Sequence, residues 1–151
     1  MKSALTVLAL TMLAGCGGGG SSPTAPSTPV PTPTPVTYNG TYTGTSMTWT
    51  NGVGQLHIAA TTTVTHTGSS LSFSDMRTTS PTAGAGSFGM GAAVLTGNAF
   101  DGTSQYSSSG CGTVTSHYRG YFSGDGGIMN MTMTLTSRCD DSDEIRGEMR
   151  R

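Results

Sequence analysis

The sequence is poor in charged residues, and its basic groups are almost all arginines. Aspartate, glutamate, lysine and arginine make up only 10% of the 151 residues, and Lys2 is the one lysine. Nucleic-acid binding requires clustered basic side chains. Here eight acidic residues outnumber seven basic ones, for a formal net charge of −1. The composition therefore argues against a nucleic-acid partner.

Helical periodicity is also missing, because no stretch repeats apolar residues at every third or fourth position. Threonine, serine and the 23 glycines supply the polarity that charged residues usually supply. Threonine favours pleated strands, and glycine favours tight turns. The sequence therefore predicts an all-β protein of the kind found outside the cytoplasm.

The N-terminus has the pattern of an export signal. Lys2 precedes an apolar run from Ala4 to Leu13, which is far shorter than the ~20 residues of a membrane-spanning helix. The run ends in Leu13-Ala14-Gly15-Cys16, which resembles the lipobox of bacterial lipoproteins. The alternative is an ordinary signal peptide followed by a spare thiol at Cys16.

The lipobox resemblance implies that residues 1–15 are a signal peptide removed before Cys16. It also implies a diacylglyceryl thioether on Cys16 and acylation of the new N-terminus, as by palmitate. The protein would then be held on its membrane by lipid on Cys16, without a spanning helix. By the same resemblance, Gly17 instead of aspartate favours the outer membrane over the inner one.

Residues 16–37 follow as a lipidated cysteine and a linker rich in glycine, serine, proline and threonine. Glycine runs are flexible and proline repeats are stiffer, so this segment is expected to be a disordered tether. Fully extended, it would reach on the order of 60 Å. Residues 38–151 are long enough for one domain with a modest core.

Glycine-containing turns divide this domain into about eight expected strands at hairpin spacing. Short sequential hairpins predict an antiparallel up-and-down meander or small barrel, and a Greek-key β-sandwich is the alternative. Ser80–Ser87 is expected to be a flexible loop. The expected strands are Tyr38–Thr50, Gly54–Thr67, Ser70–Thr79, Phe88–Thr96, Ala99–Ser107, Cys111–Phe122, Ile128–Cys139 and Glu144–Arg150.

Alternating apolar residues predict the face of each strand that is buried. The clearest case is the expected strand Ile128–Cys139, where methionine or leucine occupies every second position. The core residues predicted in this way are Leu56, Ile58, Val64, Phe88, Met90, Ala92, Val94, Met129, Met131, Met133 and Leu135.

Two further cysteines predict a disulfide. If a hairpin is centred on Asp125, Cys111 and Cys139 lie directly opposite each other at its open end. Cα atoms of such a pair are close enough for a disulfide bond, and an oxidising compartment favours it. A one-residue bulge in the glycine turn would shift this register. The chain has no C-x-x-C motif, so a structural role is expected.

The three histidines give little support for a metal site. Strict alternation places His57 and His66 on opposite faces of one strand, and no short ligand spacing joins either of them to His117. These side chains are expected to be exposed or locally hydrogen-bonded.

Methionines and carboxylates are the other candidate metal ligands. The sulfurs of Met129, Met131 and Met133 would lie ~7 Å apart along a strand, too far apart for one copper ion, so core packing is expected. The acidic run Asp140–Glu144 lacks the spacing of a calcium loop and is expected to be a solvated turn. No metal or cofactor is predicted.

No nucleophile, base and acid stand in a catalytic pattern. There is no G-x-S-x-G motif, and Ser116 points to the opposite strand face from the adjacent His117. The sequence therefore does not predict an enzyme.

The stretch NGTYTGT, residues 39–45, resembles the G-x-W opening strand of lipocalin- and avidin-like barrels, with Tyr42 at the tryptophan position. The resemblance implies a small apolar ligand at the mouth of a barrel. The first hypothesis is a lipid-anchored envelope protein whose β domain is a structural or interaction module with a protein partner. The alternative is a lipocalin-like binder of a small apolar ligand, whose ligand-facing residues the sequence does not identify.

Overall fold

The structure is a computed structural model that describes residues 34–139 and 142–151, with residues from Thr34 onward forming one compact unit. Its elements are all β-strands. They are β1 (Gly40–Asn51), β2 (Gly54–Thr67), β3 (Ser70–Phe73), β4 (Met76–Ser80), β5 (Gly84–Phe88), β6 (Ala92–Thr96), β7 (Ala99–Ser108), β8 (Gly112–Phe122), β9 (Ile128–Thr136) and β10 (Asp143–Arg150).

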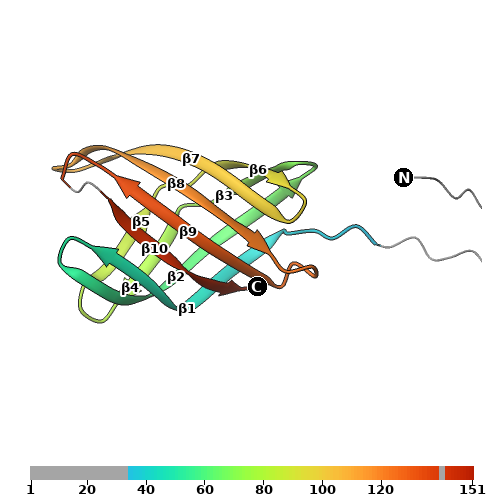
Figure 1. Ribbon diagram of the computed structural model, residues 1–151, viewed down its shortest axis with the longest axis horizontal. Helices are drawn as coiled ribbons and strands as arrows, with labels where there is room; N and C mark the ends of the chain where they lie inside the picture. Colours follow the sequence, from blue (N-terminus) through green and yellow to red (C-terminus); the bar gives the residue numbers. More distant parts are fainter. Residues whose placement is uncertain (1–33, 140–141) are drawn as a thin grey trace, which may run out of the picture. The chain divides into compact units, whose positions relative to one another are not determined.

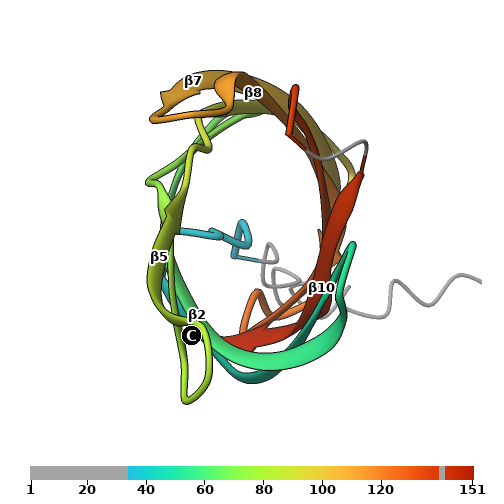
Figure 2. The same cartoon turned by 90° about the vertical axis from the view of Figure 1, so that its left-hand side faces the viewer.

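Eight of these strands close into an antiparallel barrel. The order of pairing is β1-β10-β9-β8-β7-β6-β3-β2, and β2 pairs back onto β1. Figure 2 looks into the barrel and shows the strands as a closed, flattened ring. Each barrel strand pairs with the next barrel strand along the chain, so the up-and-down barrel is confirmed and the Greek-key alternative is wrong.

The remaining two strands, β4 and β5, form a hairpin beside β2 (Figure 1). The expected flexible loop Ser80–Ser87 is therefore wrong, since Gly84–Phe88 pairs with Met76–Ser80. The backbone of the glycine-rich segment supplies the hydrogen bonds, so it needs few side chains to form a strand.

The expected strand Phe88–Thr96 is interrupted at Gly89–Gly91. The Ser116 hydroxyl, on β8, donates a hydrogen bond to the Gly89 carbonyl (2.5 Å). The Tyr118 hydroxyl, also on β8, donates to the Ala92 carbonyl (2.8 Å) and accepts from the Gly91 amide (3.0 Å). These two buried side chains replace the strand pairing that the interrupted segment lacks.

The interruption also changes which side chains of β6 face the core. Ala93 is buried, whereas Val94 is 66% exposed, so the expected inward position of Ala92 and Val94 is wrong. Phe88 and Met90 do belong to the core or pack against it. The pattern predicted for the other strands is confirmed, including the inward stripe Met129, Met131, Met133 and Leu135 of β9.

Several strands of the barrel wall have glycine at positions that face the interior. A β-carbon at Gly102 would overlap the Tyr118 ring, and one at Gly120 would overlap the backbone carbonyl of Asn130. A β-carbon at Gly147 would press against Met47. The wall can therefore approach the core closely at these points.

At one end of the barrel the chain enters β1 and the C-terminus lies nearby (Figure 1), and aromatic rings pack there. Tyr38 stacks on Phe122 with ring centroids 4.3 Å apart. The Tyr42 hydroxyl lies 2.7 Å from the Gly126 carbonyl, and burial raises the pKa of this phenol. Arg151 donates to the Thr37 and Asn39 carbonyls, which fixes the chain where it enters β1.

We predict that Gly120→Ala destabilises the barrel by about 3 kcal/mol, because the added methyl group meets rigid backbone. Gly124→Ala is the matched control, since no neighbouring atom lies within 4 Å of the place that its β-carbon would take and its φ is outside the left-handed region. Urea unfolding of the two variants checks this. Equal free energies of unfolding would contradict the packing described here.

The turn between β8 and β9 predicts a dependence of stability on pH. Asp125 accepts hydrogen bonds from the Ser123 hydroxyl (2.5 Å) and the Gly127 amide (2.9 Å), and these lower the pKa of its carboxyl from 3.8. A lowered pKa in the folded state stabilises the fold above pH ~4, and this contribution is lost as the pH falls through the folded pKa.

Asp125→Asn is therefore expected to unfold at lower urea concentration than the original protein at pH 7. The difference between the two proteins should shrink as the pH is lowered below ~4 and the Asp125 carboxylate becomes protonated. A difference that stays constant between these pH values would show that the Asp125 charge does not contribute.

Candidate functional site

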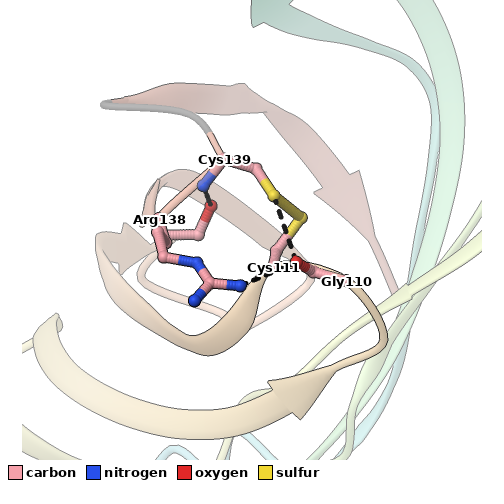
Figure 3. The surroundings of a disulfide bond; sticks show 5 residues. Gly110, Cys111, Arg138 and Cys139 are labelled. Atoms are coloured by element: carbon pink, nitrogen blue, oxygen red, sulfur yellow. Dashed lines mark hydrogen bonds between the residues drawn. A yellow bond between two sulfur atoms is a disulfide. The ribbon is translucent and has the colours of Figure 1, made fainter.

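The lipid attachment predicted at Cys16 lies outside the described residues. The predicted disulfide between Cys111 and Cys139 is present, with Cα atoms 5.2 Å apart (Figure 3). The Arg138 guanidinium donates to the Gly110 carbonyl beside it (3.3 Å). The disulfide bond therefore connects the turn between β7 and β8 to the segment that follows β9.

The register from which this bond is predicted is wrong by one residue. Phe122 pairs with Met129, so the hairpin is centred between Asp125 and Gly126. The glycine-rich turn takes up the shift. The disulfide forms nevertheless, because both cysteines lie just beyond the ends of β8 and β9. Their relative position is therefore not fixed by the pairing of these two strands.

The histidines lie in three separate environments. His57 is exposed on the outer face of β2. His66 packs against Tyr38 at 5.1 Å between ring centroids, and its Nε2 lies 2.7 Å from the Gly68 carbonyl. His117 lies on the outer face of β8, with Nε2 3.1 Å from Asp101. Within residues 34–139 and 142–151, no group of three histidine, cysteine or acidic residues has metal-site geometry.

The acidic run differs from expectation at one residue. Asp140 and Asp141 lie outside the described residues, but Asp143 begins β10 and is only 9% exposed. Its carboxylate accepts a hydrogen bond from the indole of Trp49 (3.1 Å). Asp143 therefore belongs to the packed end of the barrel and not to a solvated turn.

Ser116 and His117 lie on opposite faces of β8, as the alternation predicts. Ser116 is fully buried and bound to the interrupted wall segment, whereas His117 is exposed. The two side chains cannot act on one substrate.

A groove of about 860 Å³ lies on the outer wall of the barrel, and we call it the outer groove. It crosses six strands, from β6 through β7, β8, β9 and β10 to β1. Its lining residues are Ser46, Thr48, Val94, Thr96, Ala99, Phe100, Asp101, Arg119, Gly120, Tyr121, Asn130, Met131, Thr132, Arg146, Gly147 and Glu148.

Strand register arranges the outward side chains of the outer groove in two rows. Paired residues in the first row are Val94, Asp101, Arg119, Thr132, Arg146 and Thr48. Paired residues in the second row are Thr96, Ala99, Tyr121, Asn130 and Glu148. Between the rows, Gly120 and Gly147 point inward without side chains, so the wall is thin there.

The first row places two arginines on either side of a threonine. Arg119 pairs with Thr132 across β8 and β9, and Thr132 pairs with Arg146 across β9 and β10. Neighbouring strands are ~4.8 Å apart, so the two arginine backbones are separated by about 10 Å. Guanidinium groups on side chains of this length can reach one anion between them.

The acidic residues of the outer groove already have partners outside it. Asp101 is bound to His117, and Glu148 lies 2.6 Å from Arg150. Arg146 lies 3.6 Å from Glu144, with both side chains exposed. In the part of the chain that the structure describes, no ion pair engages Arg119.

The second row adds an exposed aromatic ring, because Tyr121 is 54% exposed. Asn130 is its partner on β9 and supplies both a hydrogen-bond donor and an acceptor.

The outer groove could not be predicted from the sequence. The outward alternation of β8 and β10 marks Arg119, Tyr121 and Arg146 as surface residues, but only the register shows that they are neighbours.

Comparison with known proteins gives no match to a protein-family model, a curated protein or a solved structure. Among the described residues, no helix has the length and hydropathy needed to cross a membrane.

We predict that Cys111→Ser combined with Cys139→Ser lowers the free energy of unfolding by about 3 kcal/mol. The bond closes a loop across a sequence separation of 28, and its loss returns that conformational freedom to the unfolded chain. Urea unfolding with and without reductant checks this. Reductant should lower the stability of the original protein and leave the double variant unchanged, and the opposite result would contradict a stabilising bond.

Proposed function

We propose that this protein is a lipid-anchored component of a bacterial cell envelope, and that its β-barrel is an interaction module that binds its partner through the outer groove. The single observation that carries the proposal is the outer groove itself, where Arg119, Arg146 and Tyr121 stand exposed on one wall. Arginine and tyrosine are enriched in binding surfaces because they combine directed hydrogen bonds with a large contact area.

The composition of the barrel interior favours this proposal over a lipocalin-like binder. Large side chains fill the interior, and Tyr42, Tyr118, Phe122, Met129 and Met133 are fully buried. A barrel that holds a small apolar ligand needs interior space for it. Tyr38 also stacks on Phe122 at the end of the barrel where the chain enters β1.

The proposed lipid anchor and the disulfide are both consistent with a location in the cell envelope. A disulfide suits an oxidising compartment outside the cytoplasm. The lipobox-like Leu13-Ala14-Gly15-Cys16 supports attachment by lipid, and Gly17 favours the outer membrane. The tether would join the barrel at Thr37, where Arg151 holds the chain, so the disulfide end would be the far end of the barrel.

The anchor is tested by the mass and location of the full-length protein expressed in a bacterium that makes lipoproteins. The original protein is expected in the membrane fraction, without residues 1–15 and with the added mass of two or three acyl chains. Cys16→Ala should lack this added mass and leave the membrane fraction, because the other two cysteines, Cys111 and Cys139, are joined in a disulfide and have no free thiol to form the thioether.

Ser22→Ala is the control, since it changes the same segment without removing the thiol. It should keep both the lipid mass and the membrane location. An original protein that carries no lipid would contradict the anchor.

A further inference from the structure

We infer that Asn51, at the tip of the β1–β2 hairpin, is a site of spontaneous covalent modification, at which its side-chain amide is converted to a carboxylate through reaction with the backbone of Gly52. The reaction consumes one water molecule and releases ammonia. The inference goes beyond the proposed function and does not depend on it, because it concerns the hairpin tip and not the outer groove or the lipid.

The chain contains two asparagine–glycine pairs, Asn39-Gly40 and Asn51-Gly52. An asparagine side chain can reach the backbone nitrogen of the next residue most easily when that residue is glycine, which has no β-carbon in the way. The sequence therefore offers two equivalent sites for this reaction. The structure distinguishes them by the groups to which the two asparagine side chains are hydrogen-bonded.

The reaction begins when the backbone nitrogen of Gly52 attacks Cγ of Asn51 and a new C–N bond forms. The bond from Cγ to the side-chain nitrogen then breaks, and this nitrogen leaves as ammonia with the proton that the backbone nitrogen loses. Water opens the resulting five-membered imide ring at one of its two carbonyl groups. The products are aspartate and isoaspartate, in which the main chain continues through the side-chain carboxyl.

The side chain of Asn51 already lies along the backbone with which it must react. The Val53 amide donates a hydrogen bond to Oδ1 of Asn51 (3.0 Å), so the side chain is folded back beside Gly52. The same donor would stabilise the negative charge that develops on Oδ1 when Cγ is attacked. Gly52 and Val53 lie beyond the last strand pair, Asn51 with Gly54, and Val53 is 94% exposed. The ring can therefore close without opening the pairing of β1 with β2.

The side chain of Asn39 is instead held by another strand. Its Oδ1 accepts a hydrogen bond from the backbone amide of His66 on β2. The backbone is also held, because Arg151 donates to the Asn39 carbonyl and Gly40 pairs with Val64. Ring closure at Asn39 must first break the bond to His66 and this end of the β1–β2 pairing. The reaction there depends on local opening of the barrel.

The modification would change the end of the barrel opposite to the place where the chain enters β1. The preceding residue, Thr50, pairs with Glu144 of β10, so the new carboxylate would stand near a charge of the same sign. In the isoaspartate product the main chain also gains one carbon atom, which disturbs the pair of Asn51 with Gly54. Both products therefore change the charge of the hairpin tip, and isoaspartate also changes its shape.

The test follows the full-length protein in non-ionic detergent during incubation at pH 8, where the attacking nitrogen loses its proton more readily than at pH 7. Samples are digested with chymotrypsin, which cleaves after Tyr42 and Trp49. The two asparagines then fall on different peptides, and mass spectrometry detects the replacement of the amide NH2 by OH. Asn51 is expected to be converted at least about tenfold faster than Asn39, which reacts only after local opening.

Asn51→Gln is expected to abolish the conversion at this position, because the longer side chain cannot close a five-membered ring. Asn39→Gln is the matched control and should leave the rate at Asn51 unchanged. In concentrated urea, which unfolds the chain, Asn39 and Asn51 of the original protein should react at similar rates, since both are followed by glycine.

Equal rates at the two sites in the folded protein would overturn the inference, and so would a faster reaction at Asn39 or an Asn51 peptide that keeps its amide. A difference that persists in urea would also overturn it, because the neighbouring residues and not the fold would then set the two rates.

Discussion

The structure depends on filling a narrow barrel with large side chains. Eight strands leave an interior that side chains alone can occupy, and here tyrosine, phenylalanine and methionine do so. Such residues fit only where the facing wall has no side chain. Tyr118 occupies the space over Gly102, Phe100 lies over Gly120, and Met47 lies against Gly147. The same glycines thin the wall beneath the outer groove, so core packing and the shape of the outer surface have one cause.

The interrupted wall segment shows how buried hydroxyl groups extend this arrangement. Gly89–Gly91 is not part of a strand, although the Phe73 amide of β3 donates to the Gly91 carbonyl (2.8 Å), and buried backbone groups without partners would be costly. Ser116 and Tyr118 of β8 supply further partners for this part of the chain. Burial raises the pKa of the Tyr118 phenol, which keeps its proton available for donation. The β4–β5 hairpin can therefore leave the barrel without breaking its closure.

Much of the fold follows from the sequence because its signals are local. The bounds of β2 are as predicted, and the methionine stripe of β9 faces the core because alternation is a property of one strand. The errors lie where distant residues decide the structure. The interruption at Gly89–Gly91 depends on side chains from β8, so alternation alone assigns the inward face of β6 to the wrong residues. The burial of Asp143 depends on Trp49, which is 94 residues away.

The outer groove could not be predicted for the same reason, and its chemistry depends on the low charge of the whole chain. Alternation identifies Arg119 and Arg146 as outward residues, but their common neighbour Thr132 is defined by two registers, one of which differs by a residue from that inferred around Asp125. Here charged residues are few and lysine is confined to Lys2, and the groove carboxylates are bound to groups outside the groove. Two arginines and two acids, Asp101 and Glu148, therefore stand out on a nearly neutral barrel, and the outer groove carries charges of both signs.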